Sequence, residues 1–98
     1  MRTLLLALLI ALALPGAAVA QVADALRKDP VYVDPRAELA SEIDADRLRE
    51  LIRSEGAAPM YIAVLPADGD PDEALRRLHA EVGLRGTYAI VSGRSFRA

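Results

Sequence analysis

The sequence predicts an α/β fold with the element order β-α-β-α-β(β). Three short runs of β-branched, aromatic and other apolar residues occupy positions 31–33, 60–65 and 87–92. Between them lie two longer segments, 41–55 and 71–82, in which apolar residues recur at helical spacing. Such alternation is typical of a mostly parallel sheet with helices packed on it and right-handed crossovers.

Turn signals and a cap define the first strand and the first helix. The strand at 31–33 stands between two Asp-Pro pairs, which favour turns. Ser41 followed by Asp44 resembles a capping box at the start of a helix. One helical stripe then contains four apolar residues, Ile43, Leu48, Leu51 and Ile52. Gly56 is the expected end of this helix, because glycine is favoured just past the last turn.

The second strand and helix follow the same logic. Residues 60–65 (MYIAVL) are too few for a helix and indicate a strand that is buried on both faces. Asp70 is the expected N-cap of the next helix, with Pro71 in its first position and Glu73 completing a capping box. The buried stripe of this helix is expected to contain Ala74, Leu75, Leu78 and Val82. Gly83 should end it.

The third strand, at 87–92 (TYAIVS), leads into a predicted hairpin. Gly93 and Arg94 form a two-residue turn with glycine first, which matches a type II′ turn. The returning strand begins at Ser95. Because so short a strand leaves an uncovered sheet edge, we expect the folding unit to continue beyond Ala98, so that the domain is incomplete at its C-terminus.

Residues 1–20 are expected to be an export signal. Arg2 provides a positive start, Leu4–Leu14 is an apolar core, and Ala18-Val19-Ala20 fits a small-x-small cleavage site. This divides the chain into a signal at 1–20, a polar connector at 21–30 and an α/β domain at 31–98. The alternative is an uncleaved leader that anchors the chain in the membrane, because residues 3–20 carry no charge.

Composition narrows the class of partner. The 98-residue chain has 12 Lys and Arg residues against 14 Asp and Glu residues, a formal net charge of −2. A nucleic-acid-binding domain needs a basic patch, so no nucleic-acid partner is expected. The chain contains no cysteine, which excludes disulfides and thiol chemistry. A domain this small must then be held together by its apolar core alone.

Three segments follow one another in the order seen in TPM domains: VYVDPRAEL, IDADRLRELIRSEGAAPMYIAVLPA and DEALRRLHAEVGLRGTYAIVSGRSFRA. The chain resembles this family from Asp29 to Ala98. The resemblance implies an extracytoplasmic α/β domain, as in exported or membrane-anchored actinobacterial proteins. Some TPM proteins are described as acid phosphatases with metal-binding acidic residues near the hairpin and beyond. The hairpin of this chain has no acidic residue at its turn, so no catalytic residue is transferred.

The loop after the second strand contains the candidate metal ligands Asp68, Asp70 and Asp72. Carboxylates at alternate positions open a calcium-loop pattern, and Ca²⁺ or another divalent cation is the alternative cofactor. The pattern fails further on, at Glu73 where glycine is needed and at His79 where glutamate is needed. Capping and the macrodipole of the following helix also explain these acids, and this structural interpretation is preferred, with no cofactor.

Two further candidate sites, His79 and the hairpin residues, each have an alternative structural interpretation. His79 is the only histidine, and without a second ligand at zinc spacing it is expected to pack at the helix boundary. Ser92, Arg94 and Ser95 could hold an anion together with the Gly93 amide. A turn that uses glycine and serine for its geometry is the preferred interpretation.

The preferred function is a non-catalytic, exported interaction module with a protein partner at the outer face of the cytoplasmic membrane. It follows from the export signal, the TPM resemblance and the lack of a recognisable nucleophile, metal cluster or cofactor loop in the sequence. The alternative is a divalent-metal-dependent phosphohydrolase of the TPM type that is incomplete in this chain. Contact with the membrane is expected if the leader is retained or if a C-terminal span follows.

Overall fold

The computed structural model describes the backbone of residues 15–55 and 59–98. Its elements are α2 (Pro15–Lys28), β1 (Val31–Val33), the 3₁₀ turn η1 (Ala40–Glu42), α3 (Ala45–Glu55), β2 (Met60–Leu65), α4 (Pro71–Val82), β3 (Thr87–Ser92) and β4 (Ser95–Arg97). This order confirms the predicted α/β class. The apolar core of the expected leader, Leu4–Leu14, and the expected helix end at Gly56 lie outside the described residues. Within the described ranges, no helix is long and apolar enough to cross a membrane.

The four strands form one sheet in the order β1-β2-β3-β4. β1, β2 and β3 are parallel, and β4 returns antiparallel to β3 through the predicted two-residue turn. The φ of +63° at Gly93 is the left-handed value that the first position of a type II′ turn requires. In the register, Tyr61 lies opposite Tyr88 and Val64 lies opposite Val91, so neighbouring strands send side chains to the same face in pairs.

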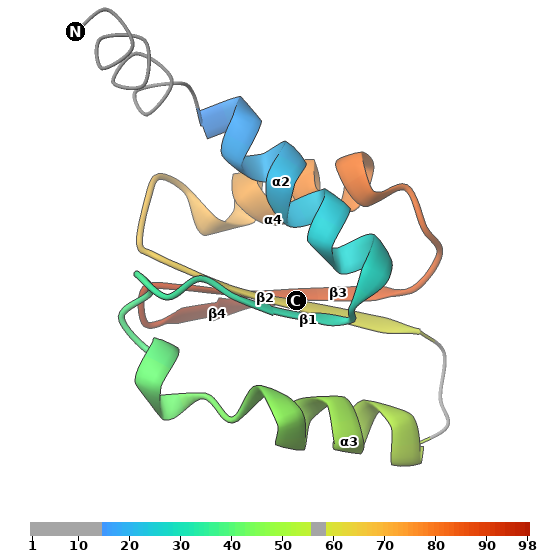
Figure 1. The fold of residues 1–98 in the computed structure, drawn as a ribbon. Helices are drawn as coiled ribbons and strands as arrows, with labels where there is room; N and C mark the ends of the chain where they lie inside the picture. Colours follow the sequence, from blue (N-terminus) through green and yellow to red (C-terminus); the bar gives the residue numbers. More distant parts are fainter. Residues whose placement is uncertain (1–14, 56–58) are drawn as a thin grey trace, which may run out of the picture.

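Helices cover both faces of the sheet, with α2 and α4 on one face and α3 on the other (Figure 1). The strands advance in one direction from β1 to β3, yet α3 and α4 connect them on opposite faces. The two crossovers therefore have opposite hands, and the expectation that both are right-handed is wrong. In Figure 1, β1 lies in front of β2, both strands run from right to left and α3 returns below the sheet, so the β1-α3-β2 crossover is the left-handed one. Because α2 packs over β1 and β2, it occupies the position that a right-handed α3 would need.

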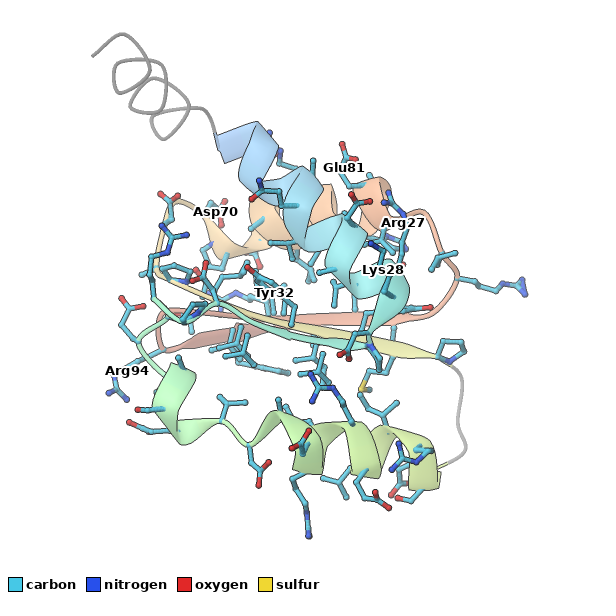
Figure 2. All side chains as sticks on the ribbon, in the orientation of Figure 1. Arg27, Lys28, Tyr32, Asp70, Glu81 and Arg94 are labelled. Carbon is cyan, nitrogen blue, oxygen red and sulfur yellow. The ribbon has the colours of Figure 1, made fainter. Side chains whose placement is uncertain are left out.

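The structure also corrects the polar connector expected at 21–30, and this difference changes the composition of the core. Residues 21–28 are the second half of α2, and its apolar side chains Val22, Ala23 and Leu26 are buried in the core between α4 and the sheet. Arg27 holds the helix in place, because its Nε donates to the Val82 carbonyl at 3.2 Å and its guanidinium also donates to the Glu81 carbonyl (Figure 2). The segment is part of the domain.

The helix α3 differs from its prediction at its start and in its burial. Asp44 is the cap, since its Oδ1 accepts from the Arg47 N–H at 3.0 Å, whereas Ser41 lies in η1. No residue of α3 is buried, and Leu51, expected on the packed stripe, is 41% exposed. The reason is that α3 lies mainly against β1 and leaves much of its stripe uncovered. Arg49 fastens it by pairing with Asp29 at 2.9 Å, which lowers the pKa of that carboxyl.

The helix α4 begins and ends as predicted. The Asp70 side chain accepts from the Asp72 N–H at 2.9 Å, and Gly83 ends the helix at φ +70°. Leu78 and Val82 are buried. Glu73 does not close a capping box, because its carboxylate pairs with Arg76 at 2.6 Å. Local signals were sufficient to place this helix.

The strand β2 is less enclosed than predicted. Ala63 and Val64 are fully buried, but Met60 at its beginning is 36% exposed. The face of the sheet opposite α2 and α4 is covered mainly near β1, where α3 lies. Burial on both faces is therefore confirmed only for Ala63 and Val64 in this strand.

Candidate functional site

A cavity of about 380 Å³ opens at the carboxyl edge of the parallel strands. The segments that follow β1 and β2 meet there with the last residue of β3, at the left end of the sheet in Figure 1. Ligands of open α/β sheets bind at this edge, because successive strands deliver loops and helix starts to the same place. One wall is apolar and consists of Val19, Val22, Leu65 and Leu78. The cavity is therefore the candidate binding site of the domain.

Asp34 is the buried carboxylate of this cavity. It follows β1 directly, and only 6% of the residue is exposed. Its side chain accepts the Arg36 backbone N–H at 2.8 Å and the Arg36 guanidinium at 3.1 and 3.2 Å. The hydrogen bonds from the Arg36 side chain hold the pKa of Asp34 below its usual range, against the opposing effect of burial. The cavity thus contains a carboxylate that stays ionised.

We expect the free energy of unfolding to depend less on pH in Asp34→Asn than in the wild type below about pH 5. The folded-state pKa of Asp34 lies below its unfolded value. Its stabilisation is therefore present above the unfolded pKa and is lost as the pH falls through the folded pKa. At neutral pH the loss of this carboxylate should cost about 1 kcal/mol, since the Arg36 partner is largely exposed. Urea unfolding at a series of pH values measures both effects.

Asp68→Asn is the control for this prediction, because Asp68 lies exposed at the rim of the same cavity. Its free energy of unfolding at neutral pH should lie within about 0.5 kcal/mol of the wild type. If Asp34→Asn keeps the full wild-type slope below about pH 5, the pair of Asp34 with Arg36 does not stabilise the fold.

Ser92 places a hydroxyl in the cavity. The residue is 7% exposed and ends β3 opposite Leu65, which also lines the cavity. Because Ser92 lines the cavity, its hydroxyl is positioned to donate to or accept from a ligand there.

The three candidate metal ligands are not brought together. Asp70 caps α4, and Asp72 lies outside the cavity, where it accepts from Arg97 at 3.0 Å. Only Asp68 and Asp70 reach the rim, beside Glu73 and Arg77. Among the described residues, no group of three or more acidic, histidine or cysteine side chains could hold a metal ion. The capping interpretation of Asp70 is confirmed by its hydrogen bond.

The other two candidates also have structural roles. The His79 ring lies 4.6 Å from the Tyr88 ring, and Tyr88 stacks in turn on Tyr61 at 5.0 Å. The Gly93 N–H, expected to help to hold an anion, donates to the Leu65 carbonyl at 2.9 Å. Arg94 lies outside the cavity, and its guanidinium is 3.9 Å from Glu42. These contacts give His79 and the hairpin turn at Gly93 and Arg94 structural roles that need no ligand.

Sequence reasoning found some residues of the cavity and missed others. Ser92, Asp68 and Asp70 were candidate ligands and do line it, although Ser92 was grouped with Arg94 and Ser95, which lie outside. Asp34 was assigned only to a turn. A useful signal was nevertheless present, because Asp34 directly follows one predicted parallel strand and Ser92 is the last residue of another. The wall formed by Val19 and Val22 could not be found, since this segment was assigned to the signal and the connector.

The comparisons with known proteins add no assignment. No protein-family model, curated protein or solved structure matches this chain. The resemblance to TPM domains therefore stays a prediction, and the candidate site rests on the geometry of the chain itself.

Proposed function

We propose that the protein is an exported, non-catalytic interaction module that binds a protein partner of the cell envelope in its carboxyl-edge cavity. One observation carries this proposal: the cavity combines an apolar wall with the ionised Asp34 and the Ser92 hydroxyl in its lining. Binding sites are typically mostly apolar with a few polar groups that fix the orientation of what enters.

The residues around the cavity favour the insertion of one side chain from a protein partner. Apolar surface from α2, β2 and α4 lies inside, and charged side chains from the loop and from α4 surround it. Protein interfaces have the same arrangement, with a desolvated apolar centre inside a polar rim. A side chain with an apolar body and a polar end fits both parts of this cavity.

Site-specific photo-crosslinking tests the proposal in intact envelopes. A photoreactive amino acid at position 68, on the rim, should give a discrete crosslinked adduct whose partner is identified by mass spectrometry. The matched position is Glu50, which is exposed on α3 at the other face of the sheet. The same probe at position 50 should not give this adduct.

Filling the cavity should strongly reduce the adduct without unfolding the domain. Ala74 lines the cavity, so Ala74→Phe should reduce crosslinking at position 68 at least about tenfold, which corresponds to a loss of about 1.4 kcal/mol in binding. Ala80→Phe, on an exposed position of the same helix, is the control and should leave the adduct unchanged. Equal adducts at positions 68 and 50 would contradict the proposal. Hydrolysis of a phosphate ester that requires a divalent cation would instead support the phosphohydrolase alternative.

A further inference from the structure

The helix α2 runs through the expected cleavage junction. It extends from Pro15 to Lys28, so the bond between Ala20 and Gln21 lies inside a continuous helix of 14 residues. Ala20 and Gln21 are themselves exposed, but Val22 and Ala23, the next two residues after the bond, are only 6% and 0% exposed. A single helix therefore contains both the end of the expected signal and a part of the core.

Cleavage of this bond requires that the helix opens. A protease must bind several residues on each side of the bond in an accessible, extended form, whereas the hydrogen bonds of α2 span the junction. Opening would also expose Val22 and Ala23 and would loosen the hold of Arg27 on the carbonyls of Glu81 and Val82. Proteolysis of a folded protein follows the small population in which such a segment is open.

We propose that folding of the domain protects the Ala20–Gln21 bond, so that processing and folding compete for the same chain. A chain that is cleaved first loses its leader. A chain that folds first keeps residues 1–20 joined to the core helix and stays attached to whatever holds its leader. The order of the two events then decides between the exported and the anchored form.

Processing also changes the candidate site, a consequence that rests on the proposed function. Val19 belongs to the apolar wall of the carboxyl-edge cavity and lies on the leader side of the bond. Cleavage removes this side chain and leaves Val22 as the remaining contribution of α2 to the wall. The processed form therefore has a wider cavity mouth than the unprocessed form.

An order-of-addition experiment on the full chain tests the protection. The chain is kept in detergent, and purified signal peptidase is added either as the chain is diluted from urea or after it has refolded, with folding followed by circular dichroism. Mass spectrometry measures the loss of residues 1–20. We expect the refolded chain to be cleaved at least about 100-fold more slowly than the chain that meets the peptidase while unfolded.

Two variants of α2 make the comparison specific. Leu26→Ala loosens the core side of the helix and should restore rapid cleavage after refolding, whether the variant folds weakly or not at all. Lys28→Ala changes an exposed residue on the same helix and should be as protected as the wild type. Equal cleavage rates for refolded and unfolded wild type, or no cleavage in either, would overturn the proposal. Neither result depends on ligand binding in the cavity.

Discussion

Leu26→Ala should destabilise the domain by roughly 3 kcal/mol, the middle of the range for a leucine removed from a packed core. Leu26 is 1% exposed and belongs to the cluster that joins α2, α4 and the sheet. The substitution removes its apolar contacts and leaves a cavity that the surrounding residues fill only in part. Chemical unfolding followed by circular dichroism measures the change. For a small domain, so large a loss is a major part of the total stability.

Leu51→Ala is the matched control, because it makes the same chemical change on the half-covered helix α3. Leu51 is 41% exposed, so its truncation should cost less than about 1 kcal/mol. If the two variants lose the same stability, α2 does not pack in the core, and the earlier interpretation of 21–30 as a connector would be restored.

Gly86→Ala should also cost roughly 3 kcal/mol, for a steric reason. The φ of Gly86 is +151°, and a Cβ added there would lie 2.6 Å from the Pro59 carbonyl oxygen and 3.0 Å from Cε2 of Tyr61. The same oxygen accepts the Thr87 N–H at 2.9 Å, at the start of the pairing of β2 with β3. The new methyl group would therefore push apart the two central strands. A thermal melt should show a decrease of roughly 12–24 °C in Tm.

Gly69→Ala separates steric contact from backbone strain. Gly69 also has a positive φ, +71°, but an added Cβ would meet no atom within 4 Å. Its replacement should cost only about 1 kcal/mol, from the left-handed backbone. If Gly86→Ala is no more destabilising than Gly69→Ala, the close approach of Gly86 to β2 does not limit the fold.

Local signals explain which elements were predictable. The cap at Asp70, the left-handed Gly83 and the turn at Gly93 and Arg94 each depend on a few neighbouring residues, and the structure confirms all three. The three apolar runs became β1, β2 and β3 for the same reason, because strand propensity and length are local properties. The start of α3 was misplaced because two capping residues, Ser41 and Asp44, were available within one turn.

The placement of the helices depended on contacts between distant residues. The burial of α2 follows from α4, which receives Val22 and Leu26, and from the hydrogen bonds of Arg27 to the end of that helix. Because residues 21–28 directly follow the expected signal, they were predicted to be a connector and not a core helix. Because α2 occupies the same face of the sheet as α4, α3 lies on the opposite face. The crossover between β1 and β2 is therefore left-handed, which is the rarer hand.

The sequence by itself determined the α/β class, the order of strands and helices from residue 31 onward and the hairpin at 92–95, because each depends on patterns within a few turns of chain. Only the tertiary structure decided that residues 21–28 belong to the core, that α3 covers little of its face, and that Asp34 and Ser92 share a cavity. These features depend on which helix packs on which face of the sheet. Contacts among residues far apart in the chain decide this packing.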